Sequence, residues 1–75
     1  MINTDVTSTI IGRNIRNSIK GKHITQKQIA NMADITECSL SRIIDGIQIP
    51  RLDTALRLAN AVGVSLEDFV KGVEL

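Results

Sequence analysis

Isoleucine recurs at every fourth position in the first third of the chain. Ile11, Ile15 and Ile19 have the spacing i, i+4, i+8, which is the repeat of one face of an α-helix. This spacing predicts a first helix over residues 8–20. The residues before it, 1–7, are mostly polar and are expected to form a frayed arm. No segment alternates with period two for long enough to predict a strand.

Later helices are indicated by the residues that start them. Thr25, Thr36 and Ser65 each stand where a hydroxyl can cap a helix, with apolar residues on either side as a staple. After Thr25 and Ser65, a Gln or Asp three positions on completes a capping box. Pro50 suits the start of a further helix, because proline cannot continue a preceding one. The sequence therefore predicts an all-α fold of five helices, over residues 8–20, 26–33, 37–45, 51–62 and 66–71.

Length and composition fit one small folded domain. The chain has 75 residues, of which 43% are hydrophobic, so residues 1–75 are expected to form a single domain rather than a disordered tail. We find no apolar run long enough to cross a membrane and no signal peptide. The single cysteine cannot form an internal disulfide, so a reducing cytoplasm is the expected location.

The charge is distributed unevenly along the chain. The net charge is +1, but residues 1–30 carry five Lys or Arg against one Asp, and residues 61–75 carry one Lys against three acidic residues. A basic amino-terminal half could face a polyanion, although an ordinary solvated surface explains the same distribution. With one Phe and no Tyr or Trp, the chain lacks the aromatic platforms of single-strand binders.

Catalytic and metal-binding patterns are not found in the sequence. His23 has no second His, Cys or paired carboxylate at ligand spacing, so we expect no metal and no cofactor. There is no Ser–His–acid arrangement, and so short a chain does not easily enclose a pocket. We therefore expect neither an enzyme nor a small-molecule substrate.

Residues 26–45, QKQIANMADITECSLSRIID, predict two helices joined by a three-residue turn. With the strings Ile24-Thr25-Gln26 and Ala61-Val62-Gly63-Val64-Ser65-Leu66, this segment resembles the bacterial and phage helix-turn-helix family of the lambda repressor, Cro and the Xre regulators. The resemblance extends over about residues 11–69. It implies a compact five-helix lambda-repressor-like domain whose helix-turn-helix is residues 26–45.

The resemblance also implies which residues meet double-stranded DNA. The helix over residues 37–45 would lie in the major groove. The positions that match base-facing ones in the family are Thr36, Glu37, Cys38, Ser41, Arg42 and Asp45. Gln26 matches a contact to the DNA backbone, and the cations Lys27 and Arg51 are also expected near phosphates.

The chemistry of these side chains leaves several roles open. Arg42 can read a guanine through two hydrogen bonds or hold a phosphate. Glu37 can accept a hydrogen bond from cytosine, or can serve only to stabilise the helix start. Cys38 is either a small residue facing DNA or a redox-sensitive thiol.

Two departures from the family pattern lead to predictions. Asp34 stands at the turn position that is usually Gly, and Asp tolerates a left-handed backbone better than most residues. Ile19 and Ile44 stand where the family often has a buried Arg–Glu pair. Because both partners are replaced together, we expect the two isoleucines to meet in the core.

The favoured function is a transcriptional repressor that binds a palindromic operator as a homodimer. The resemblance places the dimer contact near the last helix, where Val70, Val73 and Leu75 are the expected interface residues. The alternative is an antitoxin-type module that binds a protein and also regulates its own operon. An antitoxin usually carries an additional toxin-binding segment, and little chain follows the last predicted helix, so a regulator is expected.

Overall fold

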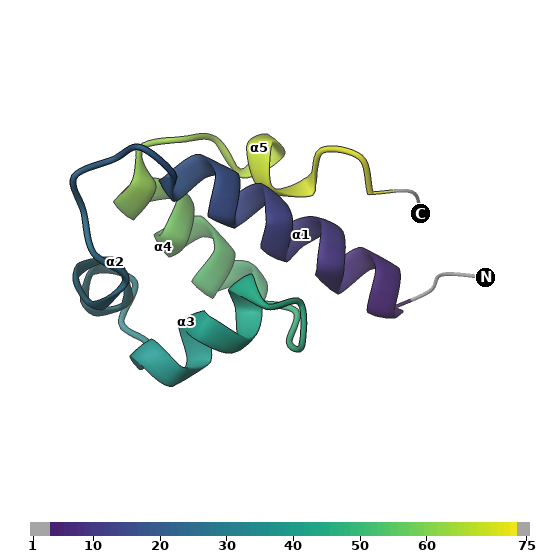
Figure 1. The fold of residues 1–75 in the computed structure, drawn as a ribbon, viewed down its shortest axis with the longest axis horizontal. Coiled ribbons are helices and arrows are strands. Elements are labelled where there is room, and N and C mark those ends of the chain that lie inside the picture. Colours follow the sequence, from purple (N-terminus) through teal and green to yellow (C-terminus); the bar gives the residue numbers. More distant parts are fainter. Residues whose placement is uncertain (1–3, 74–75) are drawn as a thin grey trace.

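The computed structural model describes residues 4–73 and contains no strand in that range. The polypeptide forms five helices (Figure 1): α1 Thr4–Ile19, α2 Gln26–Met32, α3 Glu37–Ile44, α4 Leu52–Val62 and α5 Leu66–Val70. The predicted all-α, five-helix fold is therefore confirmed. The boundaries of α2 to α5 agree with the predicted ones within one residue.

The start of α1 differs from the prediction. The helix begins at Thr4, so residues 4–7 are helical and not part of a frayed arm; residues 1–3 lie outside the described part of the chain. The amino-terminal half of α1 has a tertiary partner that its polar sequence did not reveal. Ser8 is buried, and a Cβ on Gly46 would lie 3.0 Å from the Cα of Thr9. Thr9, in the following turn of α1, therefore packs against the turn after α3, and residues 4–7 extend the helix beyond this contact.

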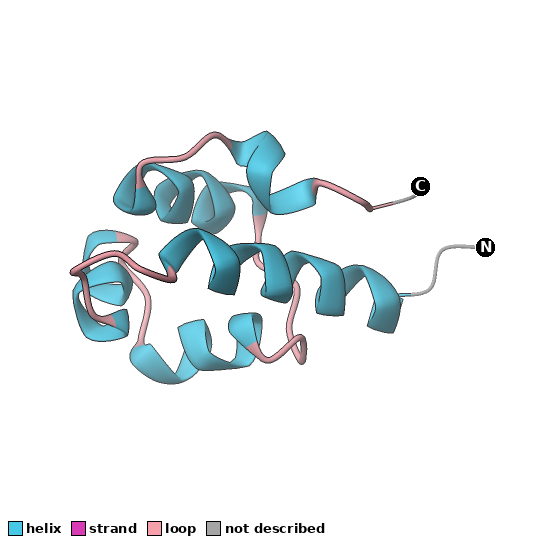
Figure 2. Cartoon of the chain, turned by 45° about the horizontal axis from the view of Figure 1, so that its top comes forward, coloured by secondary structure: helices cyan, strands magenta, loops and turns pink. Residues whose placement is uncertain are grey.

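α1 lies at the centre of the domain. It packs against α3 on one side and α5 on the other, while α2 contacts α3 and α4. Figure 2 shows α1 running between α5 and α3. The largest fully buried side chains come from all five helices: Ile15, Ile29, Leu40, Ile43, Leu58 and Phe69. The predicted isoleucine stripe of α1 thus faces the core.

α1 crosses the end of α3 at Gly12. A Cβ at this position would lie 2.5 Å from the carbonyl oxygen of Ile44 and 2.6 Å from that of Ile43. These are backbone atoms, so no side-chain rotation could relieve the clash. The absence of a side chain at Gly12 is what lets α1 approach the carboxyl end of α3, and this contact fixes how far α3 stands from the core.

Side chains from α1 and the following loop close the ends of α4 and α5. The Asn14 amide donates hydrogen bonds to the carbonyl oxygens of Phe69 and Lys71, at 2.9 and 2.8 Å. The ammonium group of Lys22 donates to the carbonyl of Val62 at 3.0 Å. Carbonyls near a helix end lack intrahelical partners, and these bonds satisfy them.

Ile19 and Ile44, which were predicted to meet in the core, both belong to it or border it, and their direct contact stays a prediction. Ile44 is buried and Ile19 is half-buried against the core residues. Both line a pocket of about 370 Å³ that opens between α1, α2 and α3. The site of the family's ion pair is therefore apolar here, and it borders an opening at the protein surface.

Candidate nucleic-acid interface

A tight turn joins α2 to α3. Asp34 has a φ of 59°, in the left-handed region, and the N–H of Ile35 donates to the carbonyl of Ala30 at 3.0 Å. Ala30 and Ala33 are fully buried, so their small side chains allow the two helices to approach closely. The expectation that Asp34 can replace glycine in this turn is confirmed.

The starts of α2 and α3 are fixed by the predicted caps. The Thr25 hydroxyl accepts from the N–H of Gln28 at 3.1 Å, and the N–H of Thr25 donates to the Gln28 side chain at 2.9 Å. The Thr36 hydroxyl accepts from the N–H of Ser39 at 3.0 Å. These bonds satisfy donors that the first helical turn cannot pair within itself. They set which residues begin each helix and therefore which residues face solvent.

α3 has one buried face and one exposed face. Leu40, Ile43 and Ile44 point into the core. The six residues predicted to face bases are all exposed: Thr36, Glu37, Cys38, Ser41, Arg42 and Asp45. Their spacing along one short helix brings them together on a single outward surface, with the free thiol of Cys38 among them.

The residues predicted to contact the DNA backbone lie on the elements before and after α3 in the chain. Gln26 and Lys27 are exposed in the first turn of α2. Arg51 is exposed at the start of α4, where its Nε lies 3.4 Å from a carboxylate oxygen of Asp53. These three residues therefore come from α2 and from the segment that leads into α4, and they do not belong to the exposed face of α3 itself.

An ion pair connects α1 to the end of α3. The guanidinium of Arg16 lies 3.1 Å from the carboxylate of Asp45, and both side chains are more than half exposed. The charge of Asp45 is thus balanced by a cation beside the outward surface of α3. Sequence reasoning placed Asp45 at this surface but did not place Arg16 there.

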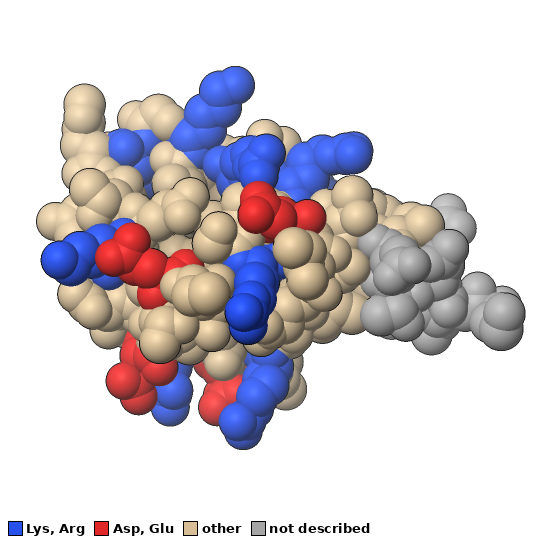
Figure 3. Space-filling model, turned by 60° about the horizontal axis from the view of Figure 1, so that its bottom comes forward, with Lys and Arg blue, Asp and Glu red and all other residues tan. Residues whose placement is uncertain are grey.

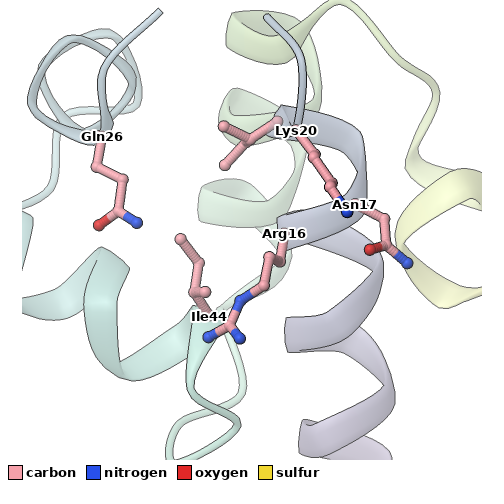
Figure 4. A pocket seen from close by; sticks show the side chains of 6 residues that line it. Arg16, Asn17, Lys20, Gln26 and Ile44 are labelled. Carbon is pink, nitrogen blue, oxygen red and sulfur yellow. The ribbon is translucent and has the colours of Figure 1, made fainter.

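Lys20 also lies close to the start of α2. Figure 4 shows Arg16, Asn17 and Lys20 from α1, Gln26 from α2 and Ile44 from α3 around the 370 Å³ pocket. A signal for these cations was present in the sequence, because Arg13, Arg16 and Lys20 follow the spacing i, i+3, i+7 away from the isoleucine stripe. The position of Arg16 and Lys20 around the pocket that Gln26 also lines depends on how α1 packs, which the spacing alone does not fix.

The side of the molecule that includes α3 carries charges of both signs. Figure 3 shows carboxylates interspersed with Lys and Arg side chains on this face. The surface is therefore not a uniform basic patch. Attraction to a polyanion has to come from individual cations at its edges.

In residues 4–73, no group of three or more His, Cys, Asp and Glu is placed to hold a metal ion. Within the same range, no helix has the length and apolar character needed to cross a membrane.

The five-helix fold, with its tight turn between α2 and α3, agrees with the result of comparison with known families. Residues 15–69 match the HTH_3 helix-turn-helix family. Because this match covers most of the chain, the protein belongs to the HTH_3 helix-turn-helix family and is a DNA-binding transcriptional regulator. Comparison with curated protein sequences gives no significant match.

Solved structures of several regulators share the fold. The restriction-modification controller protein C.AhdI from Aeromonas hydrophila superposes with a TM-score of 0.82 at 16% identity, covering 89% of this chain and 97% of that one. The SOS-response repressor LexA from Eubacterium rectale superposes with a TM-score of 0.81 at 22% identity, covering 93% of this chain and 77% of that one. The P22 c2 repressor, solved in complex with a synthetic operator, superposes with a TM-score of 0.77 at 24% identity, covering 84% of this chain and 96% of that one. The lambda-repressor-like fold is thereby confirmed.

Proposed function

We propose that this protein is a dimeric repressor that binds a palindromic operator in double-stranded DNA, with α3 in the major groove. The observation that carries the proposal is the division of α3 into a buried apolar face and an exposed face with Glu37, Cys38, Ser41 and Arg42, which Thr36 and Asp45 extend at its two ends. The major groove is about 12 Å wide and admits one α-helix. The P22 c2 repressor, which shares the fold, was solved with operator DNA.

The exposed residues divide into two roles by position. Thr36, Glu37, Cys38, Ser41 and Arg42 are the proposed base-reading set, because they share the outward surface of α3. Asp45 belongs to the same surface, but its ion pair with Arg16 suits it to orient that guanidinium.

The phosphate contacts are proposed on the flanks of α3. Gln26, Lys27 and Arg51 are exposed on neighbouring elements. We propose phosphate contacts for Arg16 and Lys20 as well, because both line the pocket that Gln26 also lines. Contacts of this kind orient the protein on the duplex and carry no direct sequence information.

The test is binding to the DNA upstream of the protein's own gene, measured by fluorescence anisotropy against a shuffled duplex of equal length. At about physiological salt we expect the natural duplex to bind on the order of a thousand-fold tighter or more. Arg42→Ala should reduce this preference. Lys71→Ala removes an exposed cation beyond α5 and serves as the matched control, for which little change is expected. Equal affinity of the wild-type protein for both duplexes would contradict sequence-specific binding.

A further inference from the structure

A surface pocket lies where α1, α2 and α3 meet. Its volume is about 370 Å³, near the lower end of the range of about 300–1,000 Å³ that ligand pockets have. The pocket therefore has room for a small molecule. Its lining residues are Arg16, Asn17, Ile19, Lys20, Gln26 and Ile44.

The pocket is separate from the predicted dimer contact. Val70 is exposed on α5, Val73 is half-buried against the core, and Leu75 lies outside the described residues. α5 packs on α1 and α4, and it contributes no residue to the pocket. A molecule in the pocket would therefore not touch the described part of that contact.

Two isoleucines give the pocket an apolar floor. Ile44 is buried, and Ile19 is half-buried against the core. The family often has an Arg and a Glu at these two positions, and their charged groups would make the same place polar. The apolar floor of Ile19 and Ile44 therefore distinguishes this chain from the usual family pattern.

The rim of the pocket is polar and positively charged. Arg16, Asn17, Lys20 and Gln26 are all exposed. Figure 4 shows the Gln26 side chain extending toward Ile44, with the guanidinium of Arg16 beside Ile44. Two of the four rim residues are cations, and among the described residues no carboxylate lines this pocket. The rim therefore attracts an anion.

Both cations have donors available for such an anion. One terminal nitrogen of Arg16 lies 3.1 Å from Asp45, which lines a neighbouring hollow of about 250 Å³ and not this pocket. A guanidinium carries five N–H donors, so a single contact leaves most of them unused. Lys20 forms no ion pair with any residue in the range 4–73.

We propose that this pocket binds a small carboxylate with a short alkyl chain, and that this ligand competes with DNA. The chain covers Ile19 and Ile44, and the carboxylate accepts hydrogen bonds from Arg16, Lys20 and the amide of Gln26. Hydrogen bonds between ionised groups are stronger than neutral ones. A neutral alkyl compound would leave the cations unused, and a simple anion such as phosphate would leave the floor uncovered. The two features together select an anion with an apolar chain.

The competition rests on the proposed function, in which Arg16, Lys20 and Gln26 contact DNA phosphates. A carboxylate held by the same donors occupies them and places a negative charge where a phosphate would lie. Ligand and DNA therefore weaken each other's binding by the same factor. The protein would release its DNA site when the carboxylate is abundant.

Hexanoate is the probe for the first test, and acetate and hexan-1-ol are its matched controls. Acetate retains the carboxylate without the chain, and hexan-1-ol retains the chain without the charge. Each compound is titrated into isotope-labelled protein without DNA, and NMR identifies the residues whose signals shift. Each methylene group removed from water strengthens binding by about four-fold. We expect hexanoate to bind more tightly than hexan-1-ol and at least about ten-fold more tightly than acetate, with shifts centred on Ile19, Gln26 and Ile44.

A pair of variants tests the role of the two cations. Arg16→Gln with Lys20→Gln removes both cations of the pocket, and Arg13→Gln with Lys71→Gln removes two exposed cations that do not line it. All four positions are exposed, so thermal unfolding should show that both variants fold. We expect the pocket variant to bind hexanoate about ten-fold more weakly or worse, and the control variant to bind it as the wild-type protein does.

Three results of these titrations would overturn the inference. They are equal affinity for hexanoate and either control compound, shifts centred away from the pocket, and unchanged hexanoate affinity in the pocket variant.

The second test measures the competition with DNA. The duplex from upstream of the gene is titrated by fluorescence anisotropy at constant ionic strength, in hexanoate or in the same concentration of acetate. At about ten times the dissociation constant of hexanoate, we expect DNA to bind about ten-fold more weakly than in acetate. Equal DNA affinity in the two salts would overturn the competition. Failure of the proposed function would be seen separately, as equal binding of the natural and shuffled duplexes when no carboxylate is added.

Discussion

Arg42 is the residue whose role most directly determines sequence preference. Its guanidinium is exposed on α3, where it can make two hydrogen bonds to one guanine. We predict that Arg42→Ala relaxes the preference at one base pair in each half-site, at a cost of about 1–3 kcal/mol in discrimination. Lys27→Ala should instead weaken binding to all sequences alike and lower the salt slope by about one.

Binding to randomised half-sites at two salt concentrations distinguishes these roles. If Arg42→Ala lowers every affinity equally and leaves the preferred sequence unchanged, Arg42 contacts a phosphate. Specificity must then come from Thr36, Glu37, Cys38 and Ser41.

Gly12 is the residue on which the packing of α1 against α3 depends most closely. A methyl group there would lie 2.5 Å from a backbone oxygen of α3, so the helices would have to separate. We predict that Gly12→Ala lowers the free energy of unfolding by about 2–3 kcal/mol, although alanine favours helices. Urea denaturation measures this effect, with Asn17→Ala on the exposed side of α1 as the control. A stability equal to wild type would show that α1 and α3 do not approach this closely.

At the scale of helices, the contact between α1 and α3 can also be tested with charges. Ile44 is buried beside Ile19, so Ile44→Glu places a carboxylate among apolar side chains. We predict a cost of about 3 kcal/mol, at the lower end for an unpaired buried charge because the adjoining pocket is open and lined by Arg16 and Lys20. Adding Ile19→Arg should recover part of this loss. Chemical denaturation of both single variants and the double variant gives the coupling energy. If the changes in unfolding free energy of the two single variants simply add in the double variant, the two side chains do not interact, which would contradict the predicted contact.

Helix boundaries were predictable wherever a local signal fixes them. The hydroxyls of Thr25 and Thr36 form the hydrogen bonds that their sequence context indicates, so the starts of α2 and α3 were correct. The start of α1 was wrong because the isoleucine stripe does not extend to residues 4–7, and the contact of Thr9 with Gly46 joins residues that are far apart in the sequence. The ion pair of Arg16 with Asp45 was missed for the same reason, since 29 positions separate the two residues.

The exposed surface of α3 was predictable because a helix with one apolar face can bury only that face. The exposure of Leu52 and Leu56 was not predictable, because the two residues have the helical spacing of core residues. The structure shows that both are exposed. Periodicity reveals which residues share a face, but not whether another element covers it.

For the whole molecule, the charge balance bears on the proposed pairing of two copies. A net charge of +1 and a surface of mixed sign give weak non-specific attraction to DNA. One domain of this size also contacts few base pairs. Two copies on one duplex double the contacts, so affinity and selectivity should depend on the dimer.

The most direct test of this account is selection of binding sites from a pool of random duplexes, followed by sequencing of the bound fraction. The account predicts an inverted repeat whose half-site centres lie about 10–10.5 base pairs apart, the spacing of recognition helices one turn apart along DNA. Enrichment of single half-sites by the wild-type protein, or of no sequence at all, would contradict the account.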